Sequence, residues 1–329
     1  MRLVKSGVIM SLVSVFALLT AIVAALGQLG RWSDRFDAIN IVLPYLVMPA
    51  LMAAALVLIA DRGRRGLASW LCGGAALLLI AGPLPRLLGE WRVRDTAACK
   101  GVFLRIVQFN LWKDNRDTVS AARWIRRVDP DLVLIEEAHN TVPMTMLLRD
   151  QYPFQQSCVG PSACSTLILA KRQPLASGGL ARADPENRGA LSAAWMRVDT
   201  VGGPFTVVAV HLGRPWPFLR FAKDRAELVR YVRSQSQATT LVAGDFNLPG
   251  WTFQLSRLEV DMGLERRSRA LPSWPAIIRG QHNPLPLLPI DHLFAGHDWT
   301  VVGMHRGPFL GSDHYPLVVD LRRCARRRS

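Results

Sequence analysis

Polar side chains stand where apolar, strand-like stretches end in the second half of this chain of 329 residues. These side chains are Asn110, Glu136 and Glu137, His211, Asp245 and Asn247, Asp291, Asp313 and His314. A packed sheet gains no stability from ending its strands in this way, whereas ligands of open α/β sheets bind beyond strand ends. We therefore predict that these side chains converge on one site.

Carboxylate and amide oxygens are ligands that suit Mg²⁺ or Mn²⁺. No Cys–His pair has the spacing of a zinc site, so zinc is not favoured. A hard cation beside an Asp–His pair is suited to the hydrolysis of phosphoesters. The metal neutralises phosphate oxygens, a carboxylate orients or deprotonates water, and a histidine stabilises the developing charge.

The elements that must position these residues are mostly strands. The pattern predicts strands over residues 102–110, 131–135, 166–170, 193–198, 205–211, 239–243, 290–295 and 317–321, and helices over 118–128 and 218–233. Many short strands with few helices between them indicate mixed sheets covered by helices, an α/β class of fold.

Six segments resemble, in order, the motifs of the endonuclease/exonuclease/phosphatase superfamily. They are VQFNLW, DLVLIEEA, FTVVAVHL, LVAGDFN, PIDHLF and GSDHYPLVVDL, within residues 101–321. LVAGDFN is the most specific of them. The resemblance implies a four-layer α/β sandwich, two mixed β-sheets flanked by helices. It also implies a metal-dependent hydrolase of the nuclease or phosphodiesterase type, with Mg²⁺ (or Mn²⁺) as its cofactor.

For the metal site, the resemblance implies that Glu137 is the principal ligand, with Asn110 beside it and Asp313 as a further acid. Glu136 is the neighbouring alternative. Successive residues of a strand point to opposite faces, so we expect only one of the two glutamates to face the site. The register of the motif favours Glu137.

For catalysis, the resemblance implies that Asp245 orients or deprotonates the attacking water and that Asn247 hydrogen-bonds the scissile phosphate. His314 contacts the phosphate and is held by Asp291. His211 is a phosphate ligand or a proton carrier. His292, beside Asp291, is expected to be a packed ring rather than a catalyst.

The first 90 residues have the composition of a membrane anchor. Residues 7–29, 39–60 and 66–85 carry no charge and are long enough to cross a bilayer as three transmembrane helices. Arg2, Lys5 and the small residues near position 25 also fit a signal peptide. The first apolar run is long for that role, which favours a retained anchor.

Loop charges predict the orientation of these helices. Arg2 and Lys5 precede the first span and three arginines lie within 62–65, whereas 30–38 holds two arginines and two aspartates. The positive-inside rule then places the N-terminus in the cytoplasm and everything after the third span outside. Disulfides Cys158–Cys164 and Cys99–Cys324 would fit an oxidising compartment. The alternative is four ordinary thiols in a cytosolic domain.

The catalytic domain is predicted over residues 100–322, followed by a basic tail at 323–329. From residue 100 onward there are 30 Lys and Arg against 20 Asp and Glu. This charge suits DNA, RNA and a phospholipid head group alike, so it does not choose a phosphoester substrate. A phosphomonoesterase and an inactive phosphate-binding protein are the alternatives. The lipid bilayer is a predicted partner, and no protein partner can be inferred.

Overall fold

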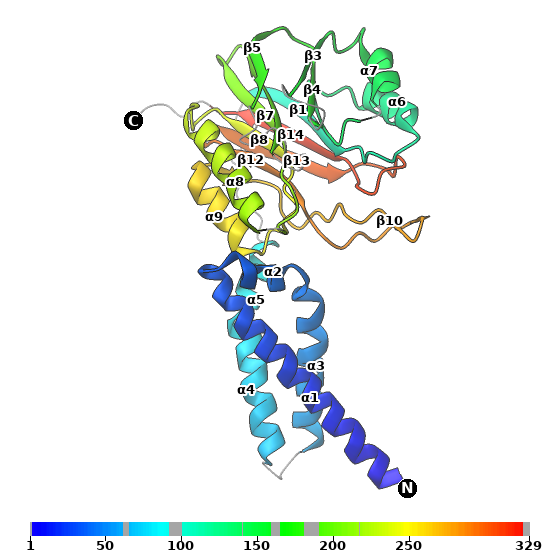
Figure 1. Ribbon diagram of the computed structural model, residues 1–329, viewed down its shortest axis with the longest axis vertical. Coiled ribbons are helices and arrows are strands. Elements are labelled where there is room, and N and C mark those ends of the chain that lie inside the picture. The colour runs from blue at the N-terminus through cyan, green and yellow to red at the C-terminus, as the bar shows by residue number, and fades with distance from the viewer. Residues whose placement is uncertain are drawn as a thin grey trace. The chain divides into compact units, whose positions relative to one another are not determined.

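The computed structural model describes residues 2–61, 66–91, 101–139, 141–158, 165–180, 191–216 and 218–324 (Figure 1). The chain divides into two compact units. One comprises Met1–Val93 together with Pro249–Ser256, and the other comprises Arg94–Leu248 and Arg257–Ser329. The first unit therefore includes eight residues from the second half of the sequence.

The first unit is helical. Its helices are α1 (Arg2–Gln28), the 3₁₀ turn η1 (Leu29–Arg31), α2 (Asp34–Val42), α3 (Pro44–Ala60), α4 (Leu67–Ala81) and α5 (Leu84–Gly89). Small buried residues such as Ala21, Ala50 and Ala75 lie between α1, α3 and α4. Such residues let apolar helices approach closely, as is usual in membranes. Large apolar side chains face outward instead, among them Leu12, Met52 and Leu77.

Two stretches, Val8–Arg31 and Leu67–Gly89, are long and apolar enough to cross a membrane. The second predicted span, 39–60, falls in a broken pair of helices, because α2 and α3 meet at an angle of 66°. Pro44 has no N–H to donate to the carbonyl of Asn40, one turn earlier. The indole Nε1 of Trp251 donates to that carbonyl instead, at 2.9 Å. The described residues thus contain two straight candidate spans, or three if the bent pair counts as one.

The second unit contains two six-stranded mixed sheets. The first has the order β13 (Trp299–Arg306), β14 (Leu317–Arg323), β1 (Val102–Asn110), β2 (Leu132–Glu136), β4 (Leu167–Ala170), β3 (Phe154–Ser157). The second has the order β5 (Pro174–Gly179), β6 (Ser192–Val198), β7 (Phe205–His211), β8 (Leu241–Asp245), β12 (Asp291–Ala295), β9 (Glu265–Arg266). A hairpin, β10 (Ile277–Ile278) and β11 (Gln281–His282), stands apart from both.

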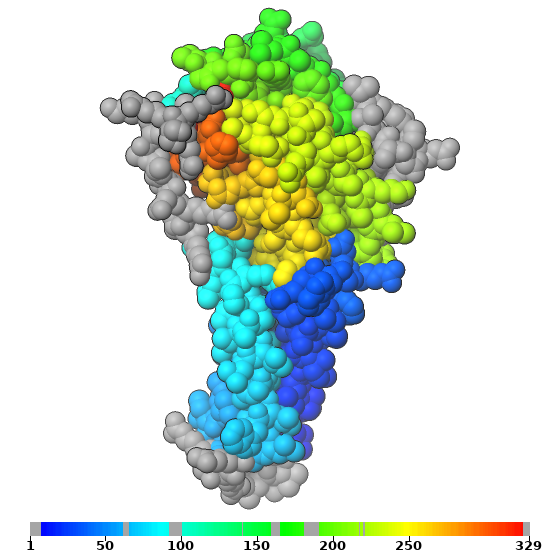
Figure 2. Space-filling model, turned by 90° about the vertical axis from the view of Figure 1, so that its left-hand side faces the viewer, coloured from blue at the N-terminus to red at the C-terminus, as the bar shows by residue number. Residues whose placement is uncertain are grey.

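Helices cover the outer faces of both sheets, which confirms the predicted four-layer sandwich. Helices α6 (Thr118–Val128) and α7 (Val142–Leu148) lie on the first sheet. Helix α8 (Phe218–Arg233) and the last part of α9 (Phe253–Met262) lie on the second (Figure 1), and yellow-green to yellow atoms of this region form much of the surface of this unit in Figure 2. Strands buried on both faces explain the continuous apolar runs in the sequence. In β1, Val107 packs toward α6, while Ile106 packs toward the second sheet.

Strand register gathers the polar strand ends at one edge of the sandwich. Strand β1 is parallel to β2 and pairs Asn110 with Glu136. Strand β7 is parallel to β8 and pairs His211 with Asp245. Strand β12 runs antiparallel to β8, and its first residue, Asp291, pairs with Asp245. Both sheets therefore contribute polar side chains at the same edge.

Candidate active site

Side chains of the two sheets are hydrogen-bonded to one another at this edge. The amide Nδ2 of Asn110, from the first sheet, donates to Asp245 Oδ2, from the second, at 3.0 Å. Gln108 Nε2 donates to Glu136 Oε2 at 2.7 Å and to Asp291 Oδ1 at 2.8 Å. The site is therefore a single polar network that bridges the two sheets.

Asp291 and His314 form a buried ion pair within this network. His314 Nδ1 lies 2.8 Å from Asp291 Oδ2, and its Nε2 lies 3.7 Å from Asp245 Oδ2. Burial lowers the pKa of the imidazole, but Asp291, Asp245 and Asp313 together raise it, to about 10. Burial acts to raise the pKa of Asp291, but His314, with the hydrogen bonds from Ser273 and Gln108, lowers it overall. His314 is thus an imidazolium at neutral pH, with Nε2 directed toward Asp245.

Asp245 is held at the end of β8 by a tight turn. Asn247 N donates to its Oδ1 at 2.8 Å, and Asn247, at φ 53°, lies in the left-handed region. Gly244 has φ 153°, and a Cβ there would lie 1.8 Å from Val210 O, so only glycine fits. Burial, reinforced by the charge of Asp291, raises the pKa of Asp245 to about 7.

The two adjacent glutamates lie in different surroundings but near the same network. Glu137 has φ 52°, so its backbone departs from strand geometry. The rule that successive strand residues point to opposite faces therefore does not apply to Glu136 and Glu137. Burial acts to raise the pKa of Glu137, but His211 and the N–H of Lys113 lower it overall. Glu136 is fully buried, and burial followed by the charge of Asp291 raises its pKa well above the usual value. Glu137 is therefore the charged one.

His211 and Asp313 complete the site. His211 Nε2 lies 3.8 Å from Asp245 Oδ2 and 4.0 Å from Glu137 Oε1, and burial lowers its pKa. Asp313 Oδ2 accepts a hydrogen bond from Trp274 Nε1 at 3.2 Å, and burial raises its pKa. The amide of Asn247 donates to Leu212 O at 2.8 Å, beside this group. The structure thus gathers all eight predicted site residues at one edge.

Comparison with known proteins identifies the fold and the family. A model of the Endonuclease/Exonuclease/phosphatase family matches residues 107–314, which is more than half of the chain. The chain belongs to this family. Its members are hydrolases that act on phosphoester bonds and use divalent metals. We found no curated protein that matches the chain in sequence.

Solved structures share the fold at low identity. An endonuclease/exonuclease/phosphatase from Beutenbergia cavernae has a TM-score of 0.55 at 21% identity, covering 68% of this chain and 72% of its own. A family protein from Bacteroides thetaiotaomicron has a TM-score of 0.54 at 14% identity, covering 70% and 99%. One from Leptotrichia buccalis has a TM-score of 0.53 at 12% identity, covering 67% and 99%.

The site of this family member fits a divalent cation. Five carboxyl groups gather around one imidazolium, and two of them, Glu137 and Asp291, have lowered pKa values, so negative charge is in excess. Within the part of the chain that the structure describes, Glu136 Oε1 and Asp313 Oδ1 are buried without a hydrogen-bond partner. Hard oxygen donors with unsatisfied capacity are what Mg²⁺ requires. Atoms of Asp245, Asp291 and His314 also lie within 4.8 Å of one another. However, the imidazole of His314 is protonated at neutral pH, and a protonated imidazole is a poor metal ligand.

The site also depends on residues that the sequence did not single out. Gln108 links Glu136 to Asp291, and Ser273 Oγ donates to Asp291 Oδ2 beside His314. A glutamine in the middle of an apolar strand was the available signal for Gln108. His292 is a packed ring, as expected. It hydrogen-bonds Ser268 and Leu248 O, and burial lowers its pKa to about 3.

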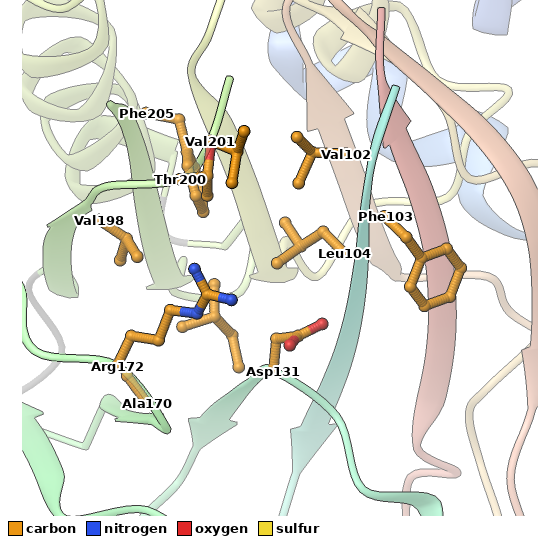
Figure 3. Close-up of a pocket in the computed structure, with 11 residues that line it drawn as sticks. Val102, Phe103, Leu104, Asp131, Ala170, Arg172, Val198, Thr200, Val201 and Phe205 are labelled. Carbon is orange, nitrogen blue, oxygen red and sulfur yellow. The ribbon is translucent and has the colours of Figure 1, made fainter. Parts of the chain in front are cut away.

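An apolar cavity of about 60 Å³ lies at the other end of the strands (Figure 3). It is lined by Val102, Phe103, Leu104, Asp131, Leu132, Ala170, Arg172, Val198, Thr200, Val201 and Phe205. These positions include the starts of β1 and β7, whereas Asn110 and His211 are their last residues. The cavity is therefore separate from the polar network.

Proposed function

We propose that this chain is a membrane-anchored, divalent-metal-dependent phosphodiesterase that acts by metal-assisted attack of water. The observation that carries the proposal is the buried Asp291–His314 ion pair directed at Asp245. A buried imidazolium beside a carboxylate with a pKa of about 7 combines a cationic donor with a proton acceptor. This pairing suits two tasks, stabilisation of the pentacoordinate transition state at phosphorus and deprotonation of water.

Glu137 would hold the metal, Mg²⁺ (or Mn²⁺), with Asn110 beside it and Asp313 as a further acid. Glu137 is charged and 3.5 Å from the Asn110 amide, and Asp313 has an unpaired buried oxygen among the described residues. When bound, the metal supplies positive charge that neutralises phosphate oxygens. The fold keeps these donors rigid through the paired ends of β1 and β2.

The remaining residues handle the water and the phosphate. Asp245 orients the water and accepts its proton as the new P–O bond forms, while the P–O bond to the leaving group breaks and the departing oxygen takes up a proton from water. Asn247 and His314 Nε2 donate hydrogen bonds to the phosphate oxygens. His211, whose pKa burial lowers, is a neutral proton carrier beside Asp245. No further base is required, because the Asp245 carboxylate already titrates close to neutral pH.

We infer that the anchor crosses the bilayer three times and that the catalytic domain, residues 100–322, is extracytoplasmic. Asp37 and Phe253 are hydrogen-bonded, so both lie on one side of the membrane. The chain between them must then cross an even number of times, so α3 crosses along with α4. Cys158 and Cys324 are each disulfide-bonded, which supports an oxidising compartment. Their expected partners, Cys164 and Cys99, and most of the basic tail lie outside the described residues.

The test uses the full chain in lipid nanodiscs with Mg²⁺ or EDTA. The substrates are bis(p-nitrophenyl) phosphate, p-nitrophenyl phosphate, plasmid DNA, RNA and phospholipid vesicles. We expect the wild type to cleave bis(p-nitrophenyl) phosphate. EDTA should prevent this cleavage, and Asp245→Ala should abolish it. Asp320→Asn is the matched control, because Asp320 pairs with Arg105 at 2.7 Å, apart from the polar network. Cleavage of the monoester alone would make the protein a phosphomonoesterase. An inactive wild type would refute the proposal.

A further inference from the structure

A buried acid of the helical unit caps the start of α9. Asp37, in α2, is fully buried, and each of its carboxylate oxygens accepts one backbone N–H. Phe253 N donates to Oδ1 at 3.0 Å, and Gln254 N donates to Oδ2 at 2.7 Å. Thr252 Oγ1 accepts the next N–H, that of Leu255, at 3.4 Å. The first three N–H groups of α9 are therefore all satisfied, two of them by Asp37.

Further contacts hold the same segment within this unit. Asn40 Nδ2 donates to Asp37 Oδ1 at 2.7 Å, and Asn40 O accepts from Trp251 Nε1 at 2.9 Å. The guanidinium of Arg86 lies 3.7 Å from the centre of the Phe253 ring, close enough for a cation–π contact. The segment Pro249–Ser256 is thus fixed by hydrogen bonds, a buried charge and a cation–π contact.

Close packing leaves Asp37 little freedom to move. A Cβ at Gly30 would lie 2.9 Å from Asp37 Oδ1, and one at Gly27 would lie 2.7 Å from Asn40 Oδ1. A Cβ at Gly30 would also lie 2.8 Å from Asp37 Cα, a backbone atom, so glycine is required at Gly30 for α2 to pack this closely. At Gly27 a Cβ would have to displace the Asn40 side chain. The chain reaches this fixed segment almost directly from the catalytic turn, because only Leu248 separates Asn247 from Pro249.

We propose that Asp37 is a positioning residue that fixes Pro249–Ser256 and, through Leu248, the Asp245–Asn247 turn. This inference rests on the proposed function, because it assigns the activity of that turn in part to the membrane helices. Leu248 itself is buried, and its carbonyl accepts from His292 Nε2 at 2.8 Å. A displacement at Pro249 therefore cannot be absorbed by a loose linker. The anchor thus helps to shape the site in addition to attaching it to the membrane.

The test compares Asp37→Asn with Asp34→Asn in the full chain in nanodiscs. The first change puts an amide NH₂ against a backbone N–H. The second removes the same charge from the same helix and leaves both backbone hydrogen bonds in place. With bis(p-nitrophenyl) phosphate and saturating Mg²⁺, we expect Asp37→Asn to lower kcat about tenfold with KM unchanged, the effect of one unsatisfied buried hydrogen bond. We expect Asp34→Asn to retain wild-type kcat.

Hydrogen exchange separates this inference from the proposed function. We expect Asp37→Asn to speed exchange at Phe253 and Gln254 and also in the peptide that covers residues 245–248. Trp251→Phe removes the indole N–H that binds Asn40 O but keeps an aromatic ring. It should show a smaller change of the same kind, which would support the inference even if the Asp37 variant misfolds. Wild-type kcat and unchanged exchange at 245–248 in Asp37→Asn would overturn the inference while the hydrolase stands. If the wild type is inactive but Asp37→Asn speeds exchange at 245–248, the positioning role is supported and the proposed hydrolase activity is refuted.

Discussion

The imidazole Nδ1 of His314 lies 2.8 Å from Oδ2 of Asp291, and both side chains are buried. Asp291 is the first residue of β12, whereas His314 lies three residues before β14, in the other sheet. The pair therefore joins the two sheets at the edge where Asp245 also lies. Its charge state determines whether Nε2 of His314 carries a proton in the role that we propose for it.

Replacement of Asp291 by asparagine should lower activity and narrow its pH range. Without the carboxylate, burial dominates and the pKa of His314 falls from about 10. We expect kcat/KM at pH 8 to fall by about 10²- to 10⁴-fold, the usual contribution of a positioned proton donor. Profiles of kcat/KM between pH 5 and 10 would show the alkaline limb moving to lower pH. An unmoved limb in Asp291→Asn would contradict the pairing, and Asp320→Asn serves as the control.

The same pair should make stability depend on pH at the alkaline end. The folded pKa of His314 is about 10, above its ordinary value of 6.5. Its contribution is therefore fully present below pH 6.5 and is lost as pH rises through about 10. Urea unfolding in EDTA at pH 6 and pH 10.5 measures this contribution as the difference between wild type and His314→Gln. We expect the difference to shrink at pH 10.5. A constant difference would show that the imidazole is not charged.

The two adjacent glutamates should respond differently to loss of charge. Glu137→Gln removes a charged ligand and should weaken Mg²⁺ binding by at least about 10- to 100-fold. Glu136 accepts from Gln108 and has a strongly raised pKa, so Glu136→Gln preserves its shape and its neutral form. Titration of the metal-free chain with Mg²⁺ by calorimetry would measure both affinities. The reverse order of effects would place the metal at Glu136.

Gly244 should tolerate no side chain. A Cβ there meets Val210 O at 1.8 Å, so Gly244→Ala must move a strand and should cost more than about 4 kcal/mol of unfolding free energy. Gly203 also has positive φ, at 88°, but nothing lies within 4 Å of its Cβ position. Gly203→Ala should cost only about 1 kcal/mol, the price of the left-handed backbone alone. Urea unfolding of both variants checks this, and equal losses would contradict the close approach of β8 to β7.

Thiol labelling should find one reactive cysteine. Cys72 is a free thiol, whereas Cys158 and Cys324 are disulfide-bonded. If the remaining cysteines are their partners, denatured but unreduced protein should take up one maleimide, and reduced protein should take up five. Mass spectrometry counts the labels. Five labels without reduction would exclude the disulfides and remove their support for an extracytoplasmic domain.

Much of the catalytic unit was predictable from the sequence, since the relevant signals are local. Apolar runs predicted the inner strands of both sheets, because these strands are buried on both faces. The four edge strands, β3, β5, β9 and β13, were not predicted. Polar residues after those runs predicted the site, since the ends of parallel strands meet at one edge. The relation of Glu136 to Glu137 was not local. It depends on the left-handed backbone of Glu137, which no strand pattern predicts.

The sequence by itself indicated which polar residues follow the strands and which stretches are apolar enough for a membrane. Only the tertiary structure decided which of them touch. Gln108 became part of the site because strand register carries its amide to Asp291, 183 positions away. Asp37 looks like an ordinary loop charge until α2 packs against Gly30 and buries it at the start of α9. Such contacts join residues far apart in the chain, and local patterns contain no information about them.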